Sequence, residues 1–144
     1  MIVIEEMKSQ HIPQIAALEG ELFSEPWSEN SIASELENPL ALWLVAVDGD
    51  TVAGYIGSQT VMEEADMLNL AVGENYRRQG IGRLLVSELI CRLDAHSLTL
   101  EVRVSNEPAK RLYDSMGFVQ VGLRKNYYHK PKEDGLILRK EWGK

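Results

Sequence analysis

Glycines and arginines crowd the segment 77–83 in a pattern suited to binding an anion. The segment reads Arg-Arg-Gln-Gly-Ile-Gly-Arg and comes directly before a stretch of helical periodicity. The first amides of a helix point outward with partial positive charge, and glycine has no Cβ to hold a ligand away from the backbone. The candidate binding residues for a phosphate-bearing ligand are therefore Arg77, Arg78, Gln79, Gly80, Ile81, Gly82 and Arg83.

Two common nucleotide-binding motifs do not fit this segment. A Walker A loop needs Gly-Lys-Ser/Thr, and a dinucleotide fingerprint needs glycine at the position that Leu85 occupies. The alternative is a glycine-rich turn whose arginines are ordinary surface charge. The flanking elements and the rest of the chain must decide between the two.

An alternation of strands and helices positions the segment. Period-two patterns and turn residues predict strands at 2–6, 40–47, 52–62, 66–72, 98–104, 118–123 and 136–140. Helical spacing and capping residues predict helices that start at Ser9, Ser28, Gly80 and Asn106. Residues 127–135 are expected to form a loop. A helical crossover should make strands 66–72 and 98–104 parallel in an otherwise mostly antiparallel sheet.

Length and composition bound the class of protein. The chain has 144 residues, 44% hydrophobic and 26% charged, which predicts one folded α/β domain over 1–144. The longest apolar run, 40–47, is far shorter than the roughly 20 residues of a membrane span, and the acidic N-terminus does not resemble a signal peptide. We therefore expect a cytoplasmic protein.

No metal site is expected. The three histidines His11, His96 and His129 are scattered, without a carboxylate at ligand spacing. Cys91 is the one cysteine, so an intramolecular disulfide is excluded. Its place in a helix and the lack of an adjacent histidine predict a small buried residue rather than a nucleophile.

The net charge of −7 argues against general nucleic-acid binding, but it is divided along the chain. Positions 1–72 carry 13 acids and one lysine, a balance of −12, whereas positions 73–144 carry 9 acids and 14 lysines or arginines, a balance of +5. The basic half contains the candidate anion loop. The acidic half could steer a basic partner.

Three blocks of sequence, in this order and spacing, resemble the GNAT superfamily of N-acetyltransferases. They are Leu-Ala-Val at 70–72, Tyr-Arg-Arg-Gln-Gly-Ile-Gly at 76–82 and Leu-Tyr-Asp-Ser-Met-Gly-Phe at 112–118. Pro-Trp-Ser at 26–28, Leu-Glu-Val-Arg-Val-Ser-Asn at 100–106 and Asn-Tyr-Tyr at 126–128 look like the RimI-type enzymes, which acetylate the N-terminal alanine of a ribosomal protein. The resemblance covers nearly the whole chain. Gly-Glu at 73–74 and the short connection 94–97 depart from it without removing a motif residue.

The resemblance implies a mixed, mostly antiparallel twisted sheet flanked by helices, with a splayed central parallel pair. Acetyl-CoA would lie between strands 66–72 and 98–104, its pyrophosphate on the segment 77–83. The backbone of Leu70, Ala71 and Val72 would contact the pantetheine arm, with Asn106 as a further contact. Alternatively, residues 70–72 are part of an ordinary buried strand.

Acetyl transfer to an amine needs a base for the amine and a proton for the departing thiolate. Glu101, between apolar strand neighbours, is the candidate base; the alternative is a surface pair with Arg103 or Arg92. Tyr113 is the candidate acid, with a phenol pKa near 10 against about 8.5 for a thiol; the alternative is simple packing.

The expected acceptor is the free N-terminal amine of a basic ribosomal protein, with Trp27 at the acceptor opening. An α-amine, with a pKa of about 7.7 to 8, is neutral far more often at pH 7 than a lysine. Small amines such as polyamines or aminoglycosides, lysine side chains, and acetyl-CoA sensing without turnover stay open as alternatives.

Overall fold

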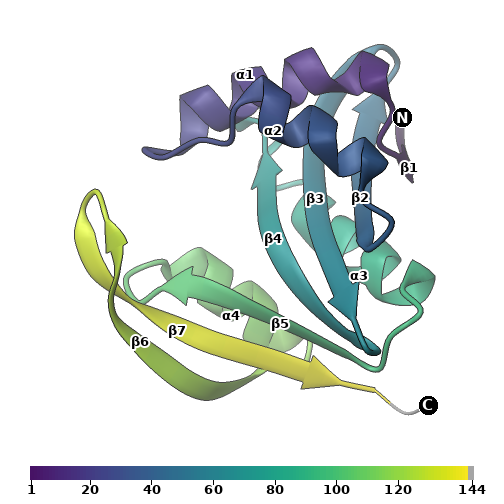
Figure 1. The fold of residues 1–144 in the computed structure, drawn as a ribbon. Coiled ribbons are helices and arrows are strands. Elements are labelled where there is room, and N and C mark those ends of the chain that lie inside the picture. The colour runs from purple at the N-terminus through teal and green to yellow at the C-terminus, as the bar shows by residue number, and fades with distance from the viewer. Residues whose placement is uncertain (143–144) are drawn as a thin grey trace. The chain divides into compact units, whose positions relative to one another are not determined.

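A computed structural model of the protein describes residues 1–142 (Figure 1). Its strands are β1 (Ile2–Glu6), β2 (Ala41–Asp48), β3 (Thr51–Val61), β4 (Glu64–Val72), β5 (Ser97–Arg103), β6 (Val119–His129) and β7 (Lys132–Glu141). Its α-helices are α1 (Ile12–Leu22), α2 (Glu29–Ser34), α3 (Ile81–Arg92) and α4 (Glu107–Ser115). Short 3-10 turns cover Ser9–His11, Glu35–Glu37 and Glu74–Tyr76.

The strands are hydrogen-bonded neighbours in the order β1-β2-β3-β4-β5-β7-β6. The β1–β2, β2–β3, β5–β7 and β6–β7 pairs are antiparallel, whereas β4 and β5 are parallel over Glu64–Asp66 and Ser97–Thr99. The expected mixed, mostly antiparallel sheet with one parallel pair is therefore confirmed. The chain divides into two compact units, Met1–Gln59 with Leu68–Leu93 (unit 1) and Thr60–Met67 with Asp94–Lys144 (unit 2).

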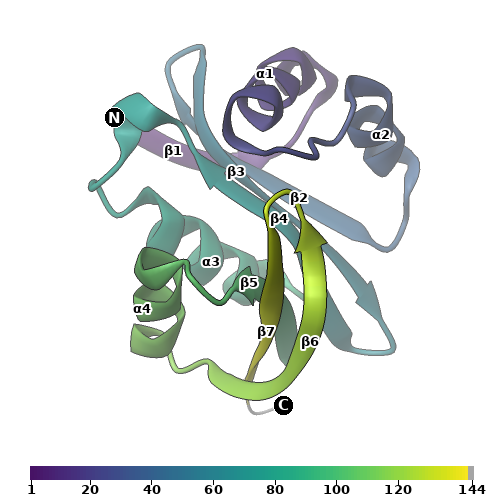
Figure 2. The same ribbon diagram turned by 90° about the vertical axis from the view of Figure 1, so that its left-hand side faces the viewer.

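In unit 1, helices cover both faces of the strands. Helices α1 and α2 lie on one face of β2 and β3, and α3 lies on the other (Figures 1 and 2). Alternation along β2 explains this, because Trp43, Val45 and Val47 pack in the core cluster with Ile15 and Ile32, while Leu44 and Ala46 point to the opposite face and are equally buried. Unit 1 therefore has a core on each side of its strands.

In unit 2, α4 lies on one side of β5 and β7 (Figure 2). The Tyr113 ring of α4 packs edge-on against Phe118, with ring centroids 5.4 Å apart, and both side chains are buried. Leu98, Leu100 and Val102 alternate along β5 and are buried as well. Unit 2 thus has its own apolar interior.

Local signals placed most elements well. Ser28 caps α2 by accepting a hydrogen bond from the Ser31 amide at 3.0 Å, and Asn106 caps α4 through the Ala109 amide at 3.2 Å. The expected cap at Ser9 is wrong, because Ser9 lies in a 3-10 turn and α1 begins at Ile12.

The expected loop at 127–135 is also wrong, because β6 and β7 continue through it as a hairpin. Cross-strand pairs join Tyr128 to Glu133 and His129 to Lys132. Glycine, proline and charged residues made this segment look like a loop, but long-range bonds from Arg103 to the carbonyls of Lys130 and Pro131 hold the turn.

One side chain on α3 also differs from expectation, because Cys91 is exposed rather than buried. The buried residues of this helix are Ile81, Leu85, Val86 and Leu89, whereas Leu84 is 40% exposed. Among residues 1–142, no helix is both long and apolar enough to cross a membrane.

Candidate active site

The anion loop lies in unit 1, where it leads from β4 into α3. Gly80 occupies the N-cap position of α3 with φ +77°, a left-handed conformation that glycine adopts without strain. The first intrahelical bond runs from the Leu84 amide to the Gly80 carbonyl at 3.0 Å, so the amides of 81–83 precede the helical ladder. The loop therefore has the backbone geometry of an anion-binding helix start.

Side chains of the loop divide between packing and solvent. Arg77, Arg78, Gln79, Gly80 and Arg83 are exposed, and Gly82 is half-buried. Ile81 is buried, so it can offer a ligand only its backbone. The Nε of Arg77 lies 3.4 Å from the Val72 carbonyl, which ties the loop back to the end of β4. This donor set of exposed guanidinium groups and helix-start amides fits a pyrophosphate.

The predicted backbone contacts at the end of β4 are also in unit 1. Ala71 is buried, whereas Leu70 and Val72 are half-buried. The Leu70 amide donates to Oδ1 of the preceding Asn69 at 3.0 Å, so a side chain satisfies a strand amide at this point. Asn69 was not expected to take part, because a polar residue in a strand carries no signal of which backbone group it will bind.

Glu101 and Tyr113 lie in unit 2. Burial raises the pKa of Glu101 above its ordinary value; Arg124 opposes this and Asp66 adds to it. The Oε2 of Glu101 lies 3.5 Å from the Nε of Arg124. The alternative partners were wrong, since Arg103 pairs with Glu133 and Arg92 with Glu88. A carboxylate with a raised pKa on a strand is a candidate general base.

Tyr113 is 5% exposed, and its hydroxyl lies 3.7 Å from the sulfur of Met67. Burial raises the pKa of Tyr113 well above 10, and the Tyr128 hydroxyl adds to the shift. The phenol therefore keeps its proton at every physiological pH. Packing and proton donation remain compatible, because the ring packs on Phe118 while the hydroxyl lies beside the sulfur of Met67, which is a weak acceptor.

Arg124 and Tyr128 of the β6–β7 hairpin interact electrostatically with Glu101, although no catalytic role was predicted for them from the sequence. Burial raises the pKa of Tyr128 to about 12, with further contributions from Tyr127 and Glu101. The Arg103 guanidinium lies 4.3 Å from the Tyr128 ring centre, and that of Arg124 lies 5.4 Å from the Tyr127 ring centre. The Asn-Tyr-Tyr block was visible in the sequence, but its contacts with β5 depend on the hairpin.

Asn106, the remaining predicted contact, is exposed at the start of α4 in unit 2. Its Oδ1 caps the helix, and its amide group is a hydrogen-bond donor seven residues before Tyr113, about two helical turns. Among residues 1–142, no group of three or more histidine, cysteine, aspartate or glutamate side chains could hold a metal ion.

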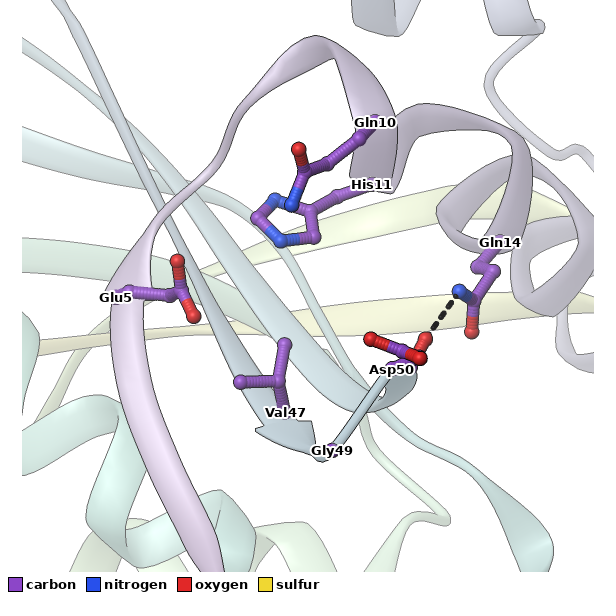
Figure 3. A pocket seen from close by; sticks show the side chains of 7 residues that line it. All are labelled: Glu5, Gln10, His11, Gln14, Val47, Gly49 and Asp50. Carbon is purple, nitrogen blue, oxygen red and sulfur yellow. Dashed lines mark hydrogen bonds between the residues drawn. The ribbon is translucent and has the colours of Figure 1, made fainter.

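A pocket of about 390 Å³ in unit 1 contains none of these residues (Figure 3). Its lining is mostly polar: Glu5, Gln10, His11, Gln14, Val47, Gly49 and Asp50. Gln14 spans the β2–β3 turn, donating to the Asp50 carbonyl at 2.8 Å and accepting from the Val52 amide at 2.7 Å. These contacts stabilise the turn, so the pocket reflects the packing of α1 on this hairpin.

Comparison with known proteins identifies the family. Residues 12–118 match the acetyltransferase (GNAT) family. A protein of Escherichia coli (strain K12) named [ribosomal protein bS18]-alanine N-acetyltransferase is 36% identical over 143 residues, 96% of each chain. A protein of Bacillus subtilis (strain 168), which is given the same name provisionally, is 40% identical over 139 residues, 94% of this chain and 92% of its own.

Solved structures give the same result. The crystal structure of the ribosomal-protein-S18-alanine N-acetyltransferase from Escherichia coli superimposes with a TM-score of 0.91 and 33% identity, covering 100% of this chain and 96% of that one. The chain therefore belongs to the acetyltransferase (GNAT) family.

Proposed function

We propose that this protein transfers the acetyl group of acetyl-CoA to the N-terminal alanine of ribosomal protein bS18. The observation that carries the proposal is the similarity to proteins of that name over nearly the whole chain, at 36% identity in sequence and a TM-score of 0.91 in structure. The family match at 12–118 includes residues of both units, which supports one catalytic domain over 1–144.

The reaction forms a bond between the amine nitrogen and the acetyl carbon and breaks the bond between that carbon and sulfur. Glu101 accepts the proton that the amine loses, and its raised pKa makes it a stronger base than an exposed carboxylate. The proton balance closes when Glu101 releases this proton to solvent and the coenzyme A sulfur takes up one proton in return.

Tyr113 stabilises the departing sulfur by hydrogen bonding. Because its pKa is raised by burial and lies above the roughly 8.5 of a thiol, complete transfer of its proton to the thiolate is uphill. A hydrogen bond to the developing negative charge still lowers the barrier, and any proton that Tyr113 gives up must return to it before the next turnover.

The loop 77–83 binds the pyrophosphate through its arginines and the amides at the start of α3. The Leu70–Val72 backbone and Asn106 contact the pantetheine arm. No metal takes part in this scheme, and the acceptor is a protein rather than a nucleic acid.

The direct test measures coenzyme A release by the full chain with three acceptors. These are a basic peptide that begins with the alanine of bS18, its Nα-blocked twin with an internal lysine, and spermidine. We expect release with the free peptide alone and, by mass spectrometry, the mass gain of one acetyl group in place of one hydrogen on its first residue. Release with the blocked peptide or only with spermidine would contradict the proposal and favour lysine or small-amine transfer.

A further inference from the structure

The carboxylate of Glu19 is buried in unit 1 and accepts hydrogen bonds from three separate segments. Glu19 is 1% exposed. The Trp27 amide donates to Oε1 at 2.9 Å, the Tyr55 hydroxyl donates to Oε2 at 2.5 Å, and Nδ2 of Asn69 donates to Oε2 as well. Buried acids are rarely retained unless several donors compensate for their lost hydration, as they do here.

The three donors come from the segment between α1 and α2, from β3 and from β4 (Figure 1). Trp27 is also held through its ring, which meets Trp43 edge-on with centroids 5.3 Å apart, and Trp43 in turn stacks on Tyr55 at 6.4 Å. Asn69 uses its other side-chain atom, Oδ1, to accept from the Leu70 amide. A chain of bonds thus runs from Trp27 through Glu19 to the Leu70 backbone.

We propose that Glu19 is a positioning residue for acetyl transfer, which fixes the Trp27 segment and the Asn69–Leu70 backbone in one arrangement. This inference rests on the proposed function, in which Leu70 contacts the cofactor, and on the expectation that Trp27 lies at the acceptor opening. Small displacements of positioning groups can lower a rate about 100-fold. One buried carboxylate therefore controls the placement of two segments that are 42 positions apart in the chain, at 27 and 69.

The polarity of the network explains why the residue is an acid. The Trp27 amide and Asn69 Nδ2 can only donate, so both oxygens of Glu19 must accept. In Glu19→Gln one oxygen becomes an NH2 group that faces Asn69. Asn69 could accept a hydrogen bond from this NH2 group only through its Oδ1, after its side-chain amide had turned over. That rotation would break the hydrogen bond between Asn69 Oδ1 and the Leu70 amide.

The same argument predicts a rescue. In Glu19→Gln with Asn69→Asp, the new carboxylate at position 69 can accept from the introduced NH2 group at position 19 through one oxygen and from the Leu70 amide through the other. The side-chain carbonyl oxygen at position 19 stays available to the Trp27 amide. The Tyr55 hydroxyl oxygen can accept from the second hydrogen of that NH2 group, so each contact of position 19 again joins a donor to an acceptor, although the charge has moved from position 19 to position 69.

The test compares the wild type with E19Q, N69D and the E19Q/N69D double variant. For E19Q we expect a loss of about 10- to 100-fold in kcat/KM for the alanine peptide. We expect amide hydrogen exchange at Trp27 and Leu70 to accelerate about tenfold or more relative to the Leu89 amide of α3. The double variant should regain at least tenfold of the lost activity and the wild-type exchange rates.

Val86→Ala is the matched control, because Val86 is a buried residue of α3 in the same unit. It should lower the melting temperature and leave the relative exchange at Trp27 and Leu70 unchanged. Wild-type exchange at both amides in E19Q would overturn the proposal, as would a double variant no better than E19Q. If E19Q does not fold, Tyr55→Phe serves instead. This variant removes a donor that holds the Glu19 carboxylate in place, and the Tyr55 hydroxyl itself contacts neither the Trp27 nor the Leu70 amide. Unchanged exchange at both amides in Tyr55→Phe would again overturn the proposal.

The exchange measurement needs no acceptor. If the wild type failed to acetylate the alanine peptide, the proposed function would fall while the positioning network could still be tested by exchange at Trp27 and Leu70. The two failures are therefore distinguishable.

Discussion

Arg124 of β6 is paired with Glu101 of β5, with 3.5 Å between Arg124 Nε and Glu101 Oε2. The Glu101 side chain is 24% exposed and that of Arg124 is 55% exposed, so the cation lies on the solvent side of the pair. Arg124 also stacks over the Tyr127 ring. The proposed base therefore has a counter-ion supplied by the β6–β7 hairpin, and this relationship leads to the first two predictions.

Glu101→Gln removes the base without a large change in shape. We expect kcat to fall about 100-fold or more, because general bases contribute on the order of 100- to 10,000-fold. Acetyl-CoA affinity, measured by calorimetry, should stay at the wild-type value. Glu88→Gln on α3, at a half-buried carboxylate that pairs with Arg92, is the control and should keep full turnover. Unchanged turnover in Glu101→Gln would rule out the role.

Arg124→Gln should move the acid limb of the rate–pH profile to higher pH. Arg124 lowers the pKa of Glu101, so its removal raises that pKa, and the deprotonated base is then reached only at higher pH. The measurement is kcat/KM from about pH 5 to 9 in buffers of constant ionic strength. An acid limb that stays in place or moves to lower pH would contradict the assignment of Glu101 as base.

Tyr113→Phe separates packing from catalysis. The hydroxyl meets the weak acceptor Met67, so its loss should change the free energy of unfolding by less than about 1 kcal/mol. Turnover should nevertheless fall about 10-fold or more if the hydroxyl stabilises the departing sulfur. Thermal unfolding and single-turnover kinetics measure the two effects, and a fully active Phe variant would leave Tyr113 a packing residue.

Gly80→Ala tests the anion loop. An added Cβ would meet no heavy atom within 4 Å, but the φ of +77° makes the backbone unfavourable for alanine by about 1 to 2 kcal/mol. We expect the loop to relax and the KM for acetyl-CoA to rise while the KM for the peptide changes little.

Gly20→Ala in α1 is the matched control for this loop variant. It also has open space and, being helical, should stabilise the protein by about 0.5 to 1 kcal/mol without changing the KM for acetyl-CoA. Equal KM values for acetyl-CoA in the two variants would argue against cofactor binding at Gly80.

Arg103→Lys tests how the β6–β7 turn is held. The guanidinium donates to the Pro131 carbonyl at 2.8 Å and the Lys130 carbonyl at 3.1 Å, and it pairs with Glu133 at 3.1 Å. Lysine keeps the charge but cannot reproduce this fork. We expect a loss of about 1 to 3 kcal/mol in stability and faster exchange of the Ser105 amide, which donates to Glu133. Arg111→Lys on α4 is the control. Equal effects of the two changes would show that the Arg103 hydrogen bonds do not hold the β6–β7 turn.

Local patterns in the sequence determined the elements and the candidate loop. The turn residues between the strands 40–47 and 52–62, the cap at Asn106 and the glycines beside arginines at 77–83 act through neighbouring residues, so they could be interpreted without the fold. The resemblance of three motifs supplied the family, which the comparisons confirm. The exposed Cys91 and the hairpin at 127–135 were mistaken because their environments depend on distant segments.

Only the tertiary structure decided which side chains form ion pairs or hydrogen bonds with one another. β7 lies between β5 and β6 in the sheet, an order that strand periodicity cannot reveal. Glu19 meets Tyr55 and Asn69, which are 36 and 50 residues away, and Glu101 meets Arg124 rather than the arginines closer in sequence. Periodicity and capping are set by backbone geometry over a few residues, whereas these partners meet only after the strands have paired and the surrounding apolar faces are buried.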